Sequence, residues 1–331
     1  MLPLLLSGVQ PTNNLHIGNY IGALKQWVEL QRHHRCIFMV VDLHAITVPQ
    51  DPALLRQSIL DVSATYLAVG IDPRNCTFFI QSEIPQHAEL AWILSSIAKM
   101  GEMERMIQYK EKSIKQGENV NLSLFSYPVL MAADIILYDT NLVPVGEDQV
   151  QHLELTRDLA ERFNARFGET FVVPQVLVQK VGARIMGLDD PHKKMSKSAA
   201  SANNYIALSD DADTIRKKVM RAVTDTDTLV HYDPATKPAV SNLLTIYHHM
   251  TGETMDKIEA RFVGKGYGDF KKDLAEVIVS HLAPITAKIQ EFKRDPGELM
   301  LMLDTGRDEA RALAEAKMKT IRQCVGLGRS Q

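Results

Sequence analysis

The sequence predicts an α/β fold, a Rossmann-like doubly wound parallel sheet followed by a second, mostly helical domain. In the first half, short apolar runs that suit buried strands alternate with segments of helical periodicity, the order typical of parallel sheets covered by helices on both faces. From about residue 209 the pattern is helical, and no alternation of apolar and polar residues indicates a strand. We expect two domains, residues 1–193 and residues 194–331.

The elements of the first half follow from the spacing of apolar residues. Residues 4–6, 36–41 and 77–80 form apolar runs that predict buried strands, and residues 18–31 and 54–69 carry apolar side chains at helical spacing. Ligands bind beyond the carboxyl ends of the strands in such sheets. The segments that follow these ends, at Ser7-Gly8, Asp42 to His44 and Gly146, are therefore candidate binding positions.

The second half predicts helices with charged faces, such as IRKKVMRAV and SNLLTIYHHM, interrupted by the glycine-rich segment 264–268. A last helix around residues 308–325 is expected to pack back on the first domain. We find no internal repeat and no low-complexity tail.

Composition narrows the classes of protein that the chain can represent. A hydrophobic content of 45% and a charged content of 23% are ordinary for a globular enzyme. No run approaches the ~20 apolar residues of a membrane span, and the start MLPLLLSG lacks the basic segment of a signal peptide. The 3 cysteines are odd in number and far apart, which favours a reducing, cytoplasmic location. A net charge of −3 means that nucleic acid would have to be held by local basic patches.

The motif HIGN at residues 16–19 lies between the first strand and a helix. The start of a helix presents unpaired N–H groups and a positive dipole end, which together suit an anion. Gly18 would let a nucleotide lie against the backbone, and His16 and Asn19 can donate hydrogen bonds to its oxygens. A capped helix with an unrelated histidine is the simpler alternative.

The motif KMSKS at residues 194–198 is positively charged and contains little to bury. A solvated surface loop is one interpretation. The other is a clamp for phosphates, in which Lys194 and Lys197 neutralise the charge that develops on departing pyrophosphate.

The two motifs together resemble the signatures of class I aminoacyl-tRNA synthetases. The runs 7–24, 127–138, 143–164 and 181–188 are similar to the bacterial tryptophanyl branch of that class, and so are 242–252 and 264–271 in the helical part. Asparagine at position 19 is usual in the tryptophanyl branch. Ala199 to Ser201 depart from the acidic and proline residues that many relatives carry there.

The resemblance implies an ATP site. In that family, the residues that match the following ones hold the adenine, ribose and phosphates: Gln10, Pro11, Thr12, Gly18, Asn19, Gly146, Glu147, Asp148, Ile185, Lys194, Met195, Ser196, Lys197 and Ser198. Lys112 is implied to reach the phosphates during the reaction, although an exposed helix lysine is equally consistent with the sequence. The catalytic group would be His16, Lys112, Lys194 and Lys197.

Asp134 marks the expected amino-acid pocket. It lies in LMAADIILY, where an unpaired carboxylate would be costly to bury. It either faces solvent, as Asp139 would, or accepts a hydrogen bond from the indole N–H of tryptophan, a group that can only donate. Met131, Val143 and Val145 could pack against the ring. His44, Tyr127 and Gln149 are either pocket residues or satisfied core residues.

The resemblance implies a tryptophan–tRNA ligase that forms tryptophanyl-adenylate from L-tryptophan and ATP, with Mg²⁺ on the phosphates and no protein metal site, and then charges tRNA(Trp). It also implies a homodimer and an anticodon-recognition role for the helical domain. Tyrosyl-tRNA synthetase is the nearest alternative, because a tyrosine hydroxyl could also donate to Asp134. A small-molecule nucleotidyltransferase and a catalytically silent relative are more distant alternatives.

Overall fold

The computed structural model describes residues 2–11, 15–110, 120–146, 149–178, 184–196, 199 and 201–329. Within these ranges, five parallel strands form one sheet in the order β3-β2-β1-β4-β5. This confirms the predicted doubly wound parallel sheet. The strands are β1 (Leu4–Val9), β2 (Arg35–Val40), β3 (Cys76–Ile80), β4 (Leu142–Val145) and β5 (Gln175–Val178).

Helices cover both faces of the sheet and make up nearly all the regular structure of the later chain. Those among the strands are α1 (Ile17–Asn19), α2 (Lys25–Leu30), α3 (Asp42–Ala45), α4 (Pro52–Ala68), α5 (Gln86–Ser95), α6 (Met100–Glu104), α8 (Leu122–Ile136) and α9 (Val150–Phe167), with short turns η1 (Tyr20–Leu24) and η2 (Gln81–Glu83). Those beyond β5 are η5 (Ala202–Asn204), α10 (Ala212–Arg221), α11 (Pro238–Thr251), α12 (Met255–Arg261), α13 (Tyr267–Arg294) and α14 (Gly297–Val325).

Most residues of β2 and β3 are buried, which explains why these strands read as apolar runs, whereas β5 at the other edge of the sheet is partly exposed. Side chains alternate between two core clusters: Leu5, Phe38 and Phe78 point into one, and Ile37 and Phe79 into the other. In the described part of the chain, no helix is long and apolar enough to cross a membrane.

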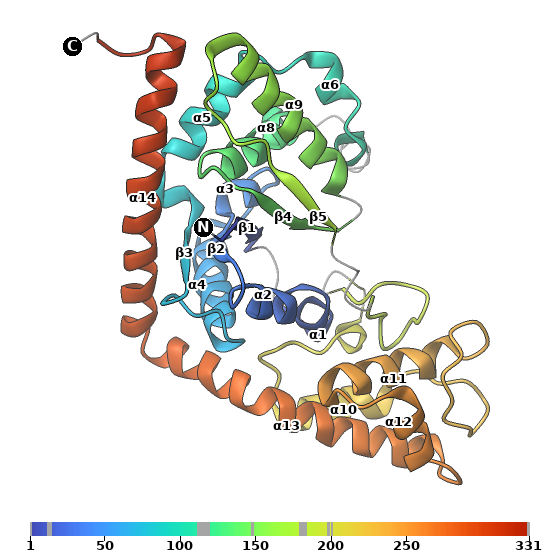
Figure 1. Cartoon of the computed structure of the whole chain (residues 1–331). Helices are drawn as coiled ribbons and strands as arrows, with labels where there is room; N and C mark the ends of the chain where they lie inside the picture. The colour runs from blue at the N-terminus through green and yellow to red at the C-terminus, as the bar shows by residue number, and fades with distance from the viewer. Residues whose placement is uncertain are drawn as a thin grey trace.

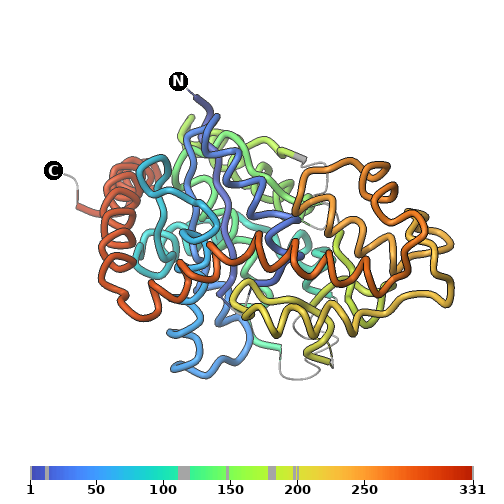
Figure 2. The backbone as a smooth tube through the Cα atoms, turned by 90° about the horizontal axis from the view of Figure 1, so that it is seen from below, coloured from blue at the N-terminus to red at the C-terminus, as the bar shows by residue number. Residues whose placement is uncertain are grey.

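Helix α14 runs along β3, the strand at one edge of the sheet, while α10 to α13 gather at the other end of the molecule (Figure 1). Seen from below, α13 crosses between the two regions (Figure 2), and it packs against α4 on the way. Helix α14 covers the outer side of β3, so this edge is not open to pairing with another strand.

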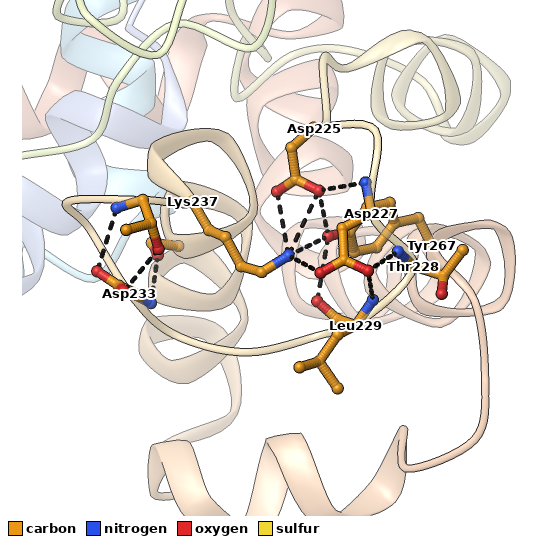
Figure 3. A network of polar contacts seen from close by, with 9 residues as sticks. Asp225, Asp227, Thr228, Leu229, Asp233, Lys237 and Tyr267 are labelled. Atoms are coloured by element: carbon orange, nitrogen blue, oxygen red, sulfur yellow. Dashed lines mark hydrogen bonds and ion pairs between the residues drawn. The ribbon is translucent and has the colours of Figure 1, made fainter.

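A polar cluster fixes the long segment between α10 and α11 (Figure 3). Lys237 Nζ lies 2.8 Å from a carboxylate oxygen of Asp227 and 3.0 Å from the hydroxyl of Tyr267. That hydroxyl donates to Asp225 at 2.6 Å. Tyr267 is the first residue of α13, so the cluster ties this segment to the start of that helix.

The stretch predicted as one helix over residues 18–31 is divided. A single turn, α1, leads into the π-helical η1 and then into α2. Periodicity could not reveal this, because a π turn inserts one residue without changing which residues are apolar. Gly22 and Ala23 of η1 line the cavity described next.

Candidate active site

A cavity of about 830 Å³ opens beyond the carboxyl ends of β1, β2 and β4. The strand order reverses at β1, so the cavity lies where doubly wound sheets bind their ligands. The predicted site residues that line it are Gln10, Gly18, Asn19, His44, Tyr127, Met131, Asp134, Val143, Val145, Gly146, Gln149, Ile185 and Lys194. The structure thus brings residues from both predicted subsites to one cavity.

Four predicted residues do not line the cavity: Pro11, His16, Met195 and Ser196. His16 and Met195 are buried, with 6% and 2% of their surface exposed. The remaining predictions, Thr12, Lys112, Glu147, Asp148, Lys197 and Ser198, lie outside the described residues.

Asp134 is buried in α8, and its carboxylate accepts three hydrogen bonds. His44 Nε2 lies 2.7 Å from Oδ2, and Gln81 Nε2 and His87 Nδ1 each lie 2.7 Å from Oδ1. Burial alone would raise the pKa of this carboxyl, but the hydrogen bonds from His44 and His87 outweigh it and lower the pKa to about 2. The group is therefore a buried anion at neutral pH, with 3% of the residue exposed. The solvent-facing alternative for Asp134 is excluded.

The proton positions around Asp134 follow from its charge. A carboxylate only accepts, so His44 donates through Nε2 and His87 through Nδ1. In neutral His87 the other nitrogen, Nε2, accepts from the hydroxyl of Tyr138 at 2.9 Å. Burial, and then the charge of Asp134, raise the pKa of Tyr138 well above its usual value, so it stays a donor.

The walls beside Asp134 are mainly apolar. Met131, Val143 and Val145 line the cavity, and the two valines are buried. The Tyr127 hydroxyl lies 2.7 Å from His152 Nε2, and its ring meets the edge of the His44 ring. Apolar walls with one buried anion suit a flat apolar ring that carries a single donor.

His16 packs against Gly18 in the structure. Its imidazole packs over Gly18, so that a Cβ at position 18 would lie 2.9 Å from His16 Nδ1. Burial, followed by the charge of Lys194, lowers the pKa of His16 to about 4, so the ring is neutral near pH 7. Nδ1 is buried, and no described residue forms a hydrogen bond with it. The His16 ring thus leaves no room for a side chain at position 18, and the ring carries no charge near pH 7.

Backbone pairing joins the start of the lysine motif to the cavity wall. Met195 N donates to Ile185 O at 3.0 Å, and Lys194 pairs with Met186. From α11, the Asn242 side chain accepts from Met186 N at 2.8 Å and donates to Met186 O at 3.0 Å. A side chain of the helical region therefore holds the segment that carries both Ile185 and Met186, the partner of Lys194.

Sequence reasoning missed several groups at the site. Gln81 had a signal, since it follows the end of a predicted strand. His87 and Asn242 had none, because each is a polar residue in an amphipathic helix and only its tertiary contacts distinguish it. Gly22, Ala23, Trp27, Gln108 and Arg184 also line the cavity.

A family model described as "tRNA synthetases class I (W and Y)" matches residues 3–283. The chain belongs to this family. The predicted resemblance is thereby confirmed, and the position of the cavity at the strand-order reversal agrees with a nucleotide-binding member of a Rossmann-like class.

Full-length relatives carry the name tryptophan–tRNA ligase. The chain is 52% identical to that of Halalkalibacterium halodurans, over 99% of this chain and 98% of the relative. It is 55% identical to that of Leifsonia xyli subsp. xyli, over 98% and 97%.

One similar solved structure is tryptophanyl-tRNA synthetase from Campylobacter jejuni, complexed with ADP and tryptophan. It superposes with a TM-score of 0.87 and is 38% identical in sequence. The match covers 98% of this chain and 100% of that one. Tyrosyl-tRNA synthetase from Aeropyrum pernix has a TM-score of 0.67 at 20% identity, covering 92% and 90%, which shows a shared fold alone.

Proposed function

We propose that the chain is a tryptophan–tRNA ligase. The observation that carries the proposal is Asp134: a buried anion beside the apolar part of the cavity wall provides an acceptor for the indole N–H. The full-length relatives of about half-identical sequence bear the same activity in their names. Met131, Val143 and Val145 would contact the ring faces, and His44, Tyr127 and Gln149 would complete the amino-acid side of the cavity.

The proposed reaction has two steps. A carboxylate oxygen of tryptophan attacks the α-phosphorus of ATP, the bond to the bridging oxygen breaks, and pyrophosphate leaves with its electron pair. A ribose hydroxyl of the terminal adenosine of tRNA(Trp) then attacks the carbonyl carbon of the adenylate, loses its proton, and releases AMP. No protein nucleophile is required, so binding and charge placement account for the protein's contribution.

ATP would enter as its Mg²⁺ complex, in which phosphate oxygens hold the ion. Within the described ranges, no three His, Cys, Asp or Glu side chains are grouped so that they could bind a metal. Gly18, Asn19, Ile185 and Gly146 would contact the nucleoside, and Lys194, with Lys197 and Lys112, would neutralise the phosphates. Gln10, Pro11, Thr12, Glu147, Asp148, Met195, Ser196 and Ser198 complete the proposed nucleotide site, and His16 would contribute a neutral hydrogen bond.

We extend the proposal to organisation and location. Residues 194–331 would recognise the anticodon of tRNA(Trp). The large apolar side chains that remain exposed on α5 and α8, Trp92 at 80% and Leu122 at 78%, support a homodimer. Cys36 and Cys76 are buried free thiols, which suits a reducing cytoplasm.

Exchange of labelled pyrophosphate into ATP tests the activity. We expect exchange with tryptophan, without tRNA, and none with the other amino acids. Exchange with tyrosine in place of tryptophan would refute the specificity, and no exchange with any amino acid would refute adenylation. Asp134→Asn should use tryptophan poorly, because the amide has a single acceptor oxygen for three internal donors and the ligand.

A further inference from the structure

His87 lies behind Asp134 and outside the cavity. It follows η2 at the start of α5, and none of its surface is exposed. Its ring joins Asp134 Oδ1 through Nδ1 at 2.7 Å and the Tyr138 hydroxyl through Nε2 at 2.9 Å. A fully buried imidazole with both nitrogens bonded has a fixed ring orientation and a fixed tautomer.

The number of acceptor sites on Asp134 makes this orientation relevant to a ligand. An ionised carboxylate offers about four hydrogen-bond acceptor sites. His44, Gln81 and His87 occupy three of them. As far as the described residues go, one site remains on a carboxylate that lines the cavity, which matches a ligand with one N–H donor.

We propose that His87, held by Tyr138, is a positioning residue that makes the cavity specific for an amino acid bearing a ring N–H. His87 touches no substrate. It acts by fixing the rotation of the Asp134 carboxylate, so that the free acceptor site faces the cavity. The inference rests on the proposed function, because it needs tryptophan as the ligand of Asp134.

The hydrogen-bonded series Tyr138–His87–Asp134 needs a central side chain that donates to Asp134 and accepts from Tyr138. Neutral imidazole does both, which neither lysine nor a carboxylate can do in this arrangement. Tyr138 lies four residues after Asp134, in the turn that follows α8, so one segment supplies both ends of the arrangement. If His87 is removed, Oδ1 loses one of its two partners and the carboxylate can rotate.

The experiment compares tryptophan with an analogue in which sulfur replaces the ring N–H, β-(3-benzothienyl)alanine. The ring keeps nearly the same shape but has no donor, so the ratio of kcat/KM values in pyrophosphate exchange isolates the hydrogen bond. We expect wild type to prefer tryptophan, and His87→Leu to lower the preference roughly tenfold or more, as loss of a charge-assisted hydrogen bond predicts. KM for ATP should be unchanged in His87→Leu.

Two further variants keep the test decisive. His87→Asn supplies an N–H near the position of Nδ1 and should retain most of the preference. Tyr138→Phe removes the hydroxyl that fixes the tautomer and should lower the preference partly. Tyr66→Phe is its matched control, since Tyr66 is also fully buried, lies in the other core cluster and has a hydroxyl that bonds to no residue the structure describes. It should leave the preference unchanged.

The outcomes separate this inference from the proposed function. If wild type treats the two amino acids equally, the contact between Asp134 and the indole is refuted, and the role of His87 with it. If wild type discriminates and His87→Leu and Tyr138→Phe discriminate equally well, only the role of His87 is refuted. Should His87→Leu fail to fold, the comparison of Tyr138→Phe with Tyr66→Phe decides by itself.

Discussion

Gly306 lies where α14 crosses β3, and we expect its replacement by alanine to destabilise the protein. An added Cβ would lie 1.9 Å from the carbonyl oxygen of Phe78, 2.7 Å from its carbonyl carbon and 3.0 Å from its nitrogen. All three are backbone atoms of a strand, so none can rotate aside. Ordinary contact begins near 3.4 Å, so the helix would have to withdraw by about 1.5 Å, the difference between 3.4 and 1.9 Å.

Withdrawal of α14 would loosen the whole line of contact with the sheet. Leu303, Ala310 and Ala314 lie on the same helix and are at most 2% exposed. Gaps of even 0.5–1 Å forfeit roughly a quarter to a half of each dispersion contact, and overpacking costs about 1–3 kcal/mol. Alanine is the better helix former by about 1 kcal/mol, which acts in the opposite direction. We expect a net loss of about 2 kcal/mol.

Thermal unfolding of Gly306→Ala measures this balance, with Gly268→Ala as the control. Gly268 is also helical, but a Cβ there would meet nothing within 4 Å. The unfolding entropy is about 2.1 cal/mol/K per residue, so for 331 residues a loss of about 2 kcal/mol lowers the unfolding midpoint by about 3 °C. Gly268→Ala should be neutral or slightly stabilising. If Gly306→Ala melts at or above the wild-type temperature, the close crossing of α14 over β3 is refuted.

Three further predictions concern the two regions and the site. Asn242→Ala should raise KM for ATP and leave KM for tryptophan unchanged, because only the segment at Met186 loses its hydrogen bonds. Steady-state exchange kinetics measure the two KM values separately, and a rise in both would refute the prediction. Folding lowers the pKa of His16 from 6.5 to about 4, so between these pH values the unfolded chain binds a proton that the folded protein does not. The free energy of unfolding therefore falls by about 3 kcal/mol as the pH falls from 6.5 to 4. Urea unfolding across this window should therefore be less pH-dependent in His16→Gln, and an unchanged slope would contradict the shift. Tyr267→Phe removes the hydroxyl that donates to Asp225 and should lower the stability of the segment 225–237 by about 1 kcal/mol, as measured by hydrogen exchange of its amides. Pyrophosphate exchange should be unaltered.

The fold was predictable because the inner part of the sheet is buried on both faces. In β2, which has a strand on either side, every residue after Arg35 is buried and apolar, so the run stands out in the sequence. The predicted bounds of β2 and β3 were correct to within one residue, whereas β1 extends to Val9, three residues beyond the predicted run, and β5 was not predicted. The crossing of α14 over β3 was predictable only in outline, since the need for Gly306 depends on a distance between two segments far apart in the chain.

The site was predictable where a residue's type restricts its role. A carboxylate among alanine and isoleucine residues, as at Asp134, is costly to bury unless it has hydrogen-bond partners, so a binding role was a strong hypothesis. The role of His16 was not predictable, because its neutrality results from burial beneath residues that follow the lysine motif. Ile17 N, for example, donates to Ile206 O. His87 and Asn242 could not be predicted because a buried polar side chain is identified by its partners, and these come from other elements.

The cost of burying Asp134 explains why the fold places three donors around it. His44 follows β2, Gln81 follows β3, and His87 begins α5, so the donors come from the ends of two neighbouring parallel strands and the helix after them. An apolar residue at position 134, with apolar partners, could pack as stably, since replacing a whole buried ionic network is often neutral or stabilising. Stability therefore does not require the network. An acceptor in an apolar cavity does require it, because a carboxylate left without those donors would gain a proton and could no longer accept reliably from an indole N–H.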